Sequence, residues 1–525
     1  MPSGVPESPI TEVLIVGAGP TGLMLACWLT RCGVRVRIID SKAGPTQETR
    51  AIAVQARTLE FYDQLGLGEQ AHQEGREVHA ASIWVKGRNV ARAVLSDMGQ
   101  SISPHPYFFI LTQDRNEAIL LGDLRDRGIE VEWNTALTAL HQSDASITAT
   151  LAQHGTVIKD GTVIKDGTVT EATCLYLCGC DGGHSVTRHL IGASFPGGTY
   201  AQTFYVADVV SRGELREGDL NLCLDDDDFQ AFFPMPGLDY QRIVGLLPRG
   251  TEEKTVTFED VRRSVEGRFS TRVEAVHWFA TYRVHHRVAH PWRQGRAFLL
   301  GDAAHVHSPA GGQGMNTGLG DAVNLAWKLT AVLRGQSVEA LLDTFEAERR
   351  PFAETLVETT DRAFTAAVSS TPLARTVRTK LVPGLLPLLT RLPAVRRLLF
   401  RTVSQTRLNY PEGAGGPISA GRVGRVRGGD RLPWLPGLYQ PMKALAWQLY
   451  VVGPPEPEAL AWSAQHGTGL QVIPFSLATH RAGYREQSAL LVRPDGYIGL
   501  IAARFGTRLF DRYWFSLFPV EVRPI

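Results

Sequence analysis

The hydropathy pattern of the chain begins with a short apolar run, a glycine-rich turn and a longer apolar segment in direct succession. The run covers residues 13–16, the turn is Gly17-Ala-Gly-Pro-Thr-Gly22, and the longer segment covers residues 23–29. A short apolar run of this kind predicts a buried strand, and the longer segment has the length and punctuation of a helix. We therefore expect a strand, a tight turn and a helix at the start of the chain.

A Rossmann dinucleotide unit has this order of elements. In such a unit Gly17 permits the tight turn, Gly19 lets a pyrophosphate approach the backbone at the helix N-terminus, and Gly22 lets the helix lie close to the strand. A second strand is expected over residues 34–39, and Asp40 follows it at the position where an acid accepts a ribose hydroxyl. This pattern predicts a site for the adenosine half of FAD or NAD, without distinguishing the two.

A second pattern, in the middle of the chain, separates these two cofactors. A strand expected from Arg296 ends at Gly301-Asp302, and a glycine-rich stretch from Gly311 opens a helix that extends to Lys328. A carboxylate at a strand end can accept hydrogen bonds from the ribityl hydroxyls of a flavin. The start of the helix directs backbone N–H groups and a positive dipole end toward the flavin ring. Both patterns together predict FAD.

Four stretches of the chain together resemble the FAD-dependent aromatic hydroxylases, the single-component flavoprotein monooxygenases typified by p-hydroxybenzoate hydroxylase and phenol hydroxylase. Two are the patterns above. Residues 113–117 resemble the glutamine segment of that family, and residues 180–188 resemble its Asp-Gly motif. The specific part of the resemblance covers residues 10–370, and the resemblance continues more faintly toward the C-terminus.

The resemblance implies a tight, non-covalent FAD site built from all four stretches and from Arg50, which matches an arginine near the pyrophosphate and the flavin. The implied cofactor-binding residues are Gly17, Gly19, Gly22, Asp40, Arg50, Gln113, Asp181, Gly182, Gly301, Asp302, Pro309, Gly312, Gly314, Met315 and Asn316. The Asp-Gly motif would also touch the nicotinamide, NADPH or NADH, which docks transiently. Asp40 stands where glutamate is commoner in the family, so its carboxylate has a shorter reach to the ribose.

The resemblance also implies the reaction. The nicotinamide reduces the flavin, O2 adds to the ring as a hydroperoxide, and the distal oxygen passes to an electron-rich carbon of the substrate. We therefore expect an NAD(P)H-consuming monooxygenase that hydroxylates a phenolic or polyketide substrate. Three alternatives stay open: an oxygenase that inactivates an aromatic antibiotic or inserts oxygen into a ring, a flavoprotein reductase without oxygen transfer, and a non-enzymatic FAD-binding regulator.

No residue can be assigned as the catalytic base from the sequence. A phenol reacts best when partly deprotonated, so a base or hydrogen-bond acceptor is expected near its hydroxyl. Tyr205 and Tyr282 lie on expected strands and could fill this role, although a tyrosine on a strand is more often a packing residue. Phe232, Phe233 and Met235 are candidates for an apolar wall over the flavin, with a plain core role as the alternative.

The expected fold class is α/β: a Rossmann-like FAD domain with an inserted antiparallel-sheet substrate domain and a C-terminal thioredoxin-like domain. The expected boundaries are 1–76, 104–190 and 285–370 for the FAD domain, 77–103 and 191–284 for the substrate domain, 371–409 for a helical connector, and 410–525 for the C-terminal domain. Antiparallel strands of the substrate domain are expected over residues 204–210, 229–235 and 242–247. A repeated hexapeptide at residues 155–169 predicts an additional hairpin on the FAD domain.

The C-terminal part, from about residue 410, resembles the phenol-hydroxylase and polyketide-hydroxylase branch in residues 428–433 and 491–498. It has no Cys-x-x-Cys for thiol redox chemistry, so a structural or subunit-contact role is inferred. The connector residues 371–407 carry eight basic and no acidic residues among closely spaced leucines. Such a stretch can lie on an anionic membrane. Packing against the FAD domain or a second copy, as in a homodimer, is the preferred interpretation.

Composition limits the range of partners. The 54 basic and 53 acidic residues leave a net charge of +1, which gives no electrostatic case for nucleic acid. No apolar run approaches the roughly 20 residues that span a bilayer, and no signal peptide is visible, so a cytoplasmic location is expected. Neither the acidic run 225–228 nor the pair His305 and His307 has the spacing of a metal site, so no metal is expected.

Overall fold

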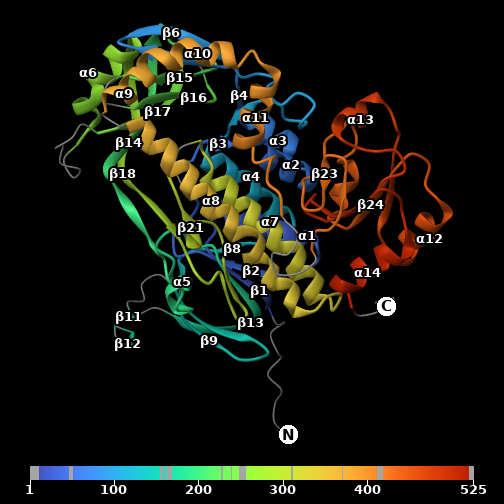
Figure 1. Cartoon of the computed structure of the whole chain (residues 1–525). Coiled ribbons are helices and arrows are strands. Elements are labelled where there is room, and N and C mark those ends of the chain that lie inside the picture. The colour runs from blue at the N-terminus through green and yellow to red at the C-terminus, as the bar shows by residue number, and fades with distance from the viewer. Residues whose placement is uncertain are drawn as a thin grey trace.

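The computed structural model describes residues 11–46, 51–153, 158–159, 162–163, 168–225, 229–237, 239–247, 256–308, 311–368, 371–410 and 418–519. Two of the expected site residues, Arg50 and Pro309, lie outside these ranges. The chain forms a mixed α/β fold with two eight-stranded sheets and a separate four-stranded sheet, as the sequence predicts (Figure 1).

The first eight-stranded sheet contains the Rossmann unit. Its main path has the order β19-β20-β13-β1-β2-β8, and β9 and β10 continue from β13. The strands are β1 (Thr11–Val16), β2 (Val36–Ile39), β8 (Val131–Glu132), β9 (Thr135–Gln142), β10 (Ile147–Gln153), β13 (Val169–Gly179), β19 (Arg293–Gln294) and β20 (Ala297–Leu299). The strand, turn and helix expected at the start of the chain are confirmed, since α1 (Pro20–Arg31) follows β1 directly. The hexapeptide repeat forms the expected hairpin where it is described, with β11 (Ile158–Lys159) antiparallel to β12 (Thr162–Val163).

Two further helices pack with α1 against this sheet: α4 (Gln113–Asp126) and α7 (Gly314–Leu333). Most of α7 is buried, as expected for a helix between a sheet and other helices. Its buried residues are mainly apolar, but they also include the polar Asn316, Asp321 and Lys328. The long helix α8 (Asp343–Val368) follows α7 through the short helix η2 (Glu339–Leu342) and crosses the molecule from the FAD domain toward the second sheet (Figure 1).

The second eight-stranded sheet has the order β21-β18-β14-β17-β16-β15-β5-β6. Its strands are β5 (Ala80–Val85), β6 (Arg88–Val94), β14 (Gly197–Gly213), β15 (Asp219–Cys223), β16 (Gln230–Pro234), β17 (Tyr240–Leu246), β18 (Thr271–Val288) and β21 (His305–Val306). The three strands expected from the sequence are present and antiparallel as β14, β16 and β17. One pair, β15 with β5, is parallel, so the sheet is mixed.

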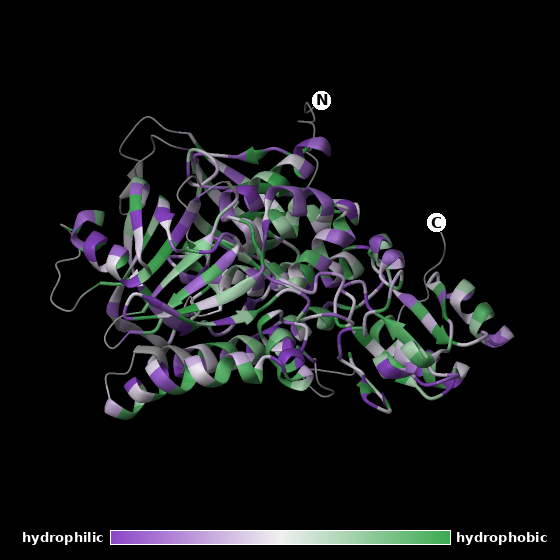
Figure 2. Cartoon of the chain, turned by 90° about the horizontal axis from the view of Figure 1, so that it is seen from above, coloured by the Kyte–Doolittle hydropathy of each residue, from purple (hydrophilic) through white to green (hydrophobic). Residues whose placement is uncertain are grey.

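Each face of this second sheet has its own apolar cluster. Helix α6 (Phe258–Phe269) covers the face that carries Tyr205, Phe232 and Ile243. The other face carries Phe204 and Phe233. Successive residues of a strand point to opposite faces, which accounts for the separation. Figure 2 shows the alternation of hydrophobic and hydrophilic residues along these strands.

Short elements join the two large sheets. A three-stranded sheet is formed by β3 (Ala53–Val54), β7 (Phe108–Ile110) and β4 (Arg76–Val78), next to α2 (Ala56–Leu65) and α3 (Gly68–Glu74). Helix α5 (Val186–Leu190) follows the Asp-Gly motif, and the short helix η1 (Gly301–Ala303) follows β20.

The connector is helical, as expected. It contains α9 (Pro372–Thr376), η3 (Val377–Leu381), α10 (Val382–Leu389) and α11 (Pro393–Val403). It packs on the chain rather than standing apart, because α10 contacts β6 and the fully buried Phe400 of α11 lies against Met98 and Ala56. Several leucines of α10, including Leu385 and Leu388, are exposed.

The C-terminal domain forms a separate lobe with its own apolar interior (Figure 2). Its sheet has the order β25-β24-β26-β27. The elements are β22 (Arg422–Val423), β23 (Val426–Arg427), η4 (Gln440–Ala444), β24 (Gln448–Val452), α12 (Pro457–Gln465), β25 (Gly469–Ile473), α13 (Leu477–Ala482), β26 (Ala489–Val492), β27 (Ile498–Ala502) and α14 (Thr507–Leu517). The turn between β26 and β27, residues 493–497, reaches into the FAD domain.

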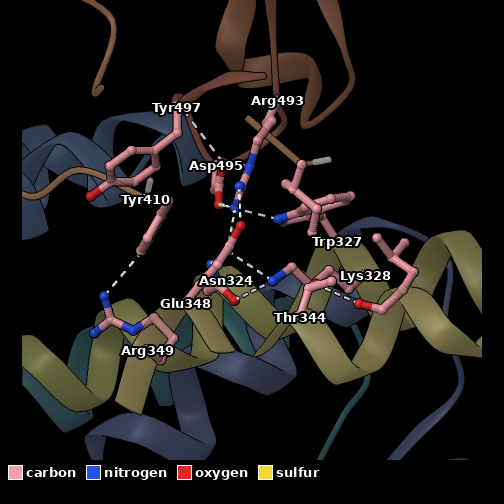
Figure 3. Close-up of polar contacts among 12 residues, drawn as sticks. Asn324, Trp327, Lys328, Thr344, Glu348, Arg349, Tyr410, Arg493, Asp495 and Tyr497 are labelled. Carbon is pink, nitrogen blue, oxygen red and sulfur yellow. Dashed lines mark hydrogen bonds and ion pairs between the residues drawn. The ribbon is translucent and has the colours of Figure 1, made fainter. Parts of the chain in front are cut away.

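A buried cluster of charges fixes that turn, which we call the anchor turn (Figure 3). Arg493 donates to both carboxylate oxygens of Glu348 on α8, at 2.6 and 3.0 Å, and also binds Asp495. Lys328 of α7 donates to Glu348 at 2.9 Å. Burial alone would raise the pKa of Glu348, but Arg493 and Lys328 outweigh it and lower the pKa to about 2. The cluster therefore holds an ionised glutamate between the two domains.

Candidate functional site

The cofactor motifs meet at one edge of the first sheet. Val16 of β1 pairs in parallel with Ile39 of β2 on one side and with Gly179 of β13 on the other, and Gly179 pairs in turn with Leu299 of β20. These four strands therefore end in one row. The residues that follow the strand ends carry the expected motifs: Gly17, Asp40, Asp181 and Gly301. In parallel sheets of this kind ligands bind outside the carboxyl ends of the strands.

The three glycines of the first turn differ in their surroundings. Gly17 has φ +104°, and a Cβ there would lie 2.4 Å from the carbonyl oxygen of Cys180. A Cβ at Gly22 would lie 2.0 Å from the carbonyl oxygen of Gly17. At Gly19 a Cβ would meet no described atom within 4 Å. Gly17 and Gly22 are thus needed by the protein itself, whereas the space at Gly19 is open to a ligand.

Asp40 is attached to the glycine turn by its carboxylate. One oxygen accepts a hydrogen bond from the backbone N–H of Ala18 and the other from that of Lys42, both at 2.8 Å. Each carboxylate oxygen has a further lone pair, so Asp40 can hold the turn and still accept a ribose hydroxyl. Gln113 lies at the start of α4 and donates to Glu117 at 2.9 Å. Burial raises the pKa of Glu117.

Thr21 joins the two halves of the expected FAD site, a role that no sequence pattern predicts. A Cβ at Gly301 would lie 2.6 Å from Thr21 Oγ1, and a Cβ at Gly318 would lie 2.3 Å from the same atom. Glycine at both positions lets α1, the loop at Gly301 and α7 approach one another closely. Asp302, next to Gly301, is exposed at this junction.

The first turn of α7 contains no acidic residue, so its N–H groups and positive dipole end are not compensated within the helix. Asn316 fixes this turn in place. Its Oδ1 accepts from the Gln55 N–H at 2.8 Å and from Thr58 Oγ1 at 2.7 Å. Its Nδ2 donates to the carbonyls of Ala53 and Gly312, at 2.9 and 2.8 Å. With its side-chain amide occupied in this way, Asn316 offers a flavin its backbone.

The Asp-Gly motif lies next to the Gly301 loop. The carboxylate of Asp181 accepts from Ser185 Oγ at 2.5 Å and from the N–H of Thr187 at 2.9 Å, and so caps α5. Arg188 of α5 donates to the carbonyls of Gly183 and Ala303, at 2.8 and 3.0 Å. The motif and the Gly301 loop are therefore attached to each other through Arg188. Gly182 has φ +77°, and a Cβ there would meet no described atom within 4 Å.

His307 borders the start of α7. A Cβ at Gly314 would lie 3.6 Å from its Nε2, and Nδ1 is 2.8 Å from the carbonyl oxygen of Ser308. Burial lowers the pKa of His307 to about 4, which leaves the ring uncharged at neutral pH. Within the described ranges no group of three or more His, Cys, Asp or Glu side chains could hold a metal ion.

The five candidate residues of the substrate region lie on two different faces of the second sheet. Phe232 packs edge to face on Phe269 of α6, with 4.6 Å between the ring centroids. The fully buried Tyr205 belongs to the same cluster under α6. Phe233 and Met235 pack together on the opposite face, near the three-stranded sheet. Tyr282 also lies on that face, stacked on Phe204 at 5.5 Å. The structure thus brings together Phe233 and Met235, and separates Phe232 and Tyr205 from them.

The arrangement at the strand ends fits FAD. It combines an open glycine turn with a buried carboxylate at one end, and an exposed carboxylate with an uncompensated helix N-terminus at the other. These are the groups that a pyrophosphate, a ribose, a ribityl chain and a flavin ring would need. Of the other candidates, Gly312 has φ +63° and Met315 is partly buried in the first turn of α7.

Comparison with known proteins gives concordant results. Over residues 10–360 the chain matches the family described as "FAD binding domain". It is 32% identical over 506 residues to the 12-dehydrotetracycline 5-monooxygenase/anhydrotetracycline 6-monooxygenase of Streptomyces rimosus, a match that covers 94% of this chain and 95% of that relative. It is 33% identical over 540 residues to the 6-methylpretetramide 4-monooxygenase of Streptomyces rimosus, covering 96% and 92%.

A solved structure extends the likeness to three dimensions. The OxyS anhydrotetracycline hydroxylase from Streptomyces rimosus is 31% identical in sequence and superposes with a TM-score of 0.74, over 97% of this chain and 99% of that one. The match therefore includes the C-terminal domain as well as both large sheets. Among the helices in the described ranges, none has the length and apolarity needed to cross a bilayer.

Proposed function

Since the chain belongs to the family of FAD-dependent aromatic monooxygenases, we propose that it hydroxylates a polycyclic aromatic polyketide with electrons from NADPH or NADH. The observation that carries the proposal is the row of strand ends: the open turn at Gly19 follows β1, and the exposed Asp302 follows β20 in the same row. The named relatives are monooxygenases of 12-dehydrotetracycline, anhydrotetracycline and 6-methylpretetramide, which supports a fused aromatic substrate.

FAD, when bound, supplies the chemistry of O2 activation and oxygen transfer, and the protein binds, orients and excludes water. In the proposed complex Asp40 accepts a ribose hydroxyl, Gly19 admits the pyrophosphate, and Asp302 accepts hydrogen bonds from the ribityl chain. The N-terminus of α7 would lie beside the ring, where its positive dipole end would stabilise negative charge. Because His307 is uncharged, it adds no charge of its own beside the N-terminus of α7.

The substrate is proposed to lie between the flavin end of this site and the face of the second sheet that carries Phe233 and Met235. The patch around these two residues is apolar and aromatic, since they pack with Ile52, Phe108 and Ile110. Such a surface suits a flat polycyclic ring system. Tyr282 lies on the same face and is the better placed of the two tyrosines to meet a substrate hydroxyl, since Tyr205 is under α6.

The nicotinamide is proposed to dock near the Asp-Gly motif. Arg188 holds this motif against the Gly301 loop, so a nucleotide bound there would approach the flavin end of the site. Arg188 itself is buried, so the backbone N–H groups of the glycine turn would contact the diphosphate.

Oxidation of NADPH and NADH by the purified protein in air tests the proposal, with and without tetracyclic and angular polyketide phenols, and with mass spectrometry of the products. Substrate-stimulated oxidation and a product one oxygen heavier are expected. Reduction of a substrate without oxygen gain would replace the monooxygenase by a reductase. A ring-opened or inactivated antibiotic as the product would favour the alternative oxygenase on the same scaffold.

Two variants test the site assignment. Asp302→Ala should fold and lose FAD affinity, because an exposed hydrogen-bond acceptor for the ribityl chain is removed. Phe233→Ala should raise KM and change the product distribution, whereas Phe232→Ala should leave both unchanged and lower the free energy of unfolding by about 3–5 kcal/mol. Full FAD retention in Asp302→Ala, or equal effects of the two phenylalanine variants on KM, would contradict these assignments.

A further inference from the structure

A second carboxylate, Asp321, lies behind the loop that carries Asp302. It belongs to α7 and is fully buried. Its Oδ2 accepts a hydrogen bond from the backbone N–H of Gly301 at 3.1 Å and from Nε2 of His305 at 2.7 Å. Gly301 and His305 stand at the two ends of the loop, so one carboxylate holds both. His305 is itself fully buried and stacks on Trp292 at 5.3 Å.

Arg349 of α8 orients this carboxylate. Its Nε donates to Asp321 Oδ1 at 2.7 Å, and its Nη2 donates to the carbonyl oxygen of Thr317 in the first two turns of α7 at 2.9 Å. Its Nη1 donates to the hydroxyl of Tyr410, at the start of the C-terminal part, at 3.1 Å (Figure 3). Arg349 is 1% exposed. One guanidinium thus connects the Asp302 loop, the start of α7 and the chain that leads to the C-terminal domain.

The surroundings are shaped for this guanidinium. A Cβ at Gly320 would lie 3.0 Å from Arg349 Nη2, so glycine leaves the room that the side chain occupies. Burial alone would raise the pKa of Asp321, but Arg349 and His305 outweigh it and hold the pKa below its ordinary value. Asp321 is therefore an ionised acceptor, and hydrogen bonds to an ionised acceptor are about twice as strong as neutral ones.

Stability alone does not account for a pair of this kind, because a buried ion pair contributes little more than apolar residues of the same volume. The pair does fix the distance between two elements, because its hydrogen bonds end on both of them. These are the loop with Asp302 and the N-terminus of α7, which the proposed function places beside the flavin.

We propose that Arg349 and Asp321 are positioning residues for the oxygenation reaction. They hold the Asp302 loop in place relative to the N-terminus of α7 and thereby set the affinity for FAD and the midpoint potential of the bound flavin. The proposal rests on the proposed function, since it takes both elements to contact FAD. Neither residue touches the cofactor in this arrangement. Their effect passes through Gly301, His305 and the carbonyl oxygen of Thr317.

The test uses the full-length protein loaded with FAD and compares Arg349→Met, Arg349→Lys and Tyr410→Phe with the unmodified chain. Arg349→Met should raise the Kd for FAD about tenfold, the size expected when a charge-assisted hydrogen bond is lost. It should also shift the visible spectrum of the flavin and make its midpoint potential more negative, because the helix dipole is no longer held against the ring. Arg349→Lys should restore part of each change, since it keeps the charge.

Arg431→Met is the matched control. Arg431, like Arg349, belongs to a buried ion pair, but its partner is Glu60 of α2 and its other hydrogen bond goes to the carbonyl oxygen of Ile102, away from the Asp302 loop and α7. It should lower the free energy of unfolding and leave the flavin spectrum and potential unchanged. If Arg349→Met fails to fold, Tyr410→Phe decides, because it removes only the hydroxyl that accepts from Arg349 and should give a smaller change of the same sign.

The outcomes separate the two proposals. A wild-type protein that binds no FAD would overturn the proposed function itself. A wild-type protein that binds FAD, together with an Arg349→Met protein of unchanged Kd and potential, would overturn the positioning role alone. Equal spectral and potential changes in Arg431→Met would also overturn it, since they would reduce the effect to a general loss of stability.

Discussion

Removal of Arg493 should detach the C-terminal domain from the FAD domain. Its side chain is 0% exposed and forms ion pairs with Glu348 and Asp495, whose side chains are 3% and 1% exposed. Arg493→Met keeps most of the volume but leaves Asp495 buried, with Trp327 Nε1 at 3.2 Å as its partner across the interface. Breaking a buried ion pair from one side costs about 3–5 kcal/mol, and we expect a loss within this range.

The same domain offers a matched control, Arg504→Met. Arg504 pairs with Glu456 at 2.6 Å, as close as Arg493 to Glu348, but it is 66% exposed. An exposed pair contributes about 0–1 kcal/mol. Urea unfolding followed by tryptophan fluorescence should report the difference, since Trp447, Trp462 and Trp514 all lie in the C-terminal domain. Limited trypsin digestion should release that domain from Arg493→Met at a lower urea concentration.

A double-mutant cycle with Glu348→Gln isolates the interaction between the two side chains. We expect the second substitution to cost much less in the Arg493→Met background than in the wild type. A loss below about 1 kcal/mol for Arg493→Met, or equal losses for it and Arg504→Met, would refute the view that the buried cluster holds the domains together.

Three further predictions concern the turn, the pH response and the Asp-Gly motif. Gly22→Ala should unfold the glycine turn, because its Cβ would lie 2.0 Å from a carbonyl oxygen, whereas Gly19→Ala should fold normally and lose FAD affinity in a fluorescence titration; normal folding of Gly22→Ala would contradict this. The pKa values of Glu60 and Glu348 are lowered from 4.5 to about 2, so each contributes stability that is present above about pH 4.5 and is lost as the pH falls toward 2; urea midpoints should drop in this window, and less so in Glu348→Gln. Arg188→Met should slow flavin reduction by NAD(P)H in stopped flow and also lower the free energy of unfolding, since the buried Arg188 donates to two carbonyls; an unchanged rate of reduction would separate the motif from the nicotinamide.

The local part of the fold could be predicted because it depends on neighbours in the sequence. The turn from Gly17 to Gly22 is set by the backbone freedom of glycine, and the apolar runs on either side of it have strand and helix periods. The positions of Gly17 and Gly22 against nearby backbone confirm the structural roles expected for them. The separation of Phe232 from Phe233 could not be foreseen, because it depends on which face of the strand packs under α6.

The contacts that complete the site come from residues far apart in the chain. Asn316 binds residues 53–58, more than 250 positions away, and no local pattern marks this partnership. The pairing of Arg349 with Asp321 spans 28 residues and two helices, and depends on how α7 and α8 pack. The sequence of a charged stretch such as residues 346–350 does not indicate whether an arginine in it is buried or exposed. Only the packing distinguishes them.

The anchor turn also sets an order of events during synthesis. Glu348 and its partner Arg493 are 145 residues apart in the chain. At the usual rate of translation the ribosome needs about 7–30 s to make that stretch. During this time the chain contains Lys328 and Glu348 but not yet the arginine that completes the cluster. The surface that will receive the anchor turn stays open to water until the C-terminal domain has emerged and folded against it.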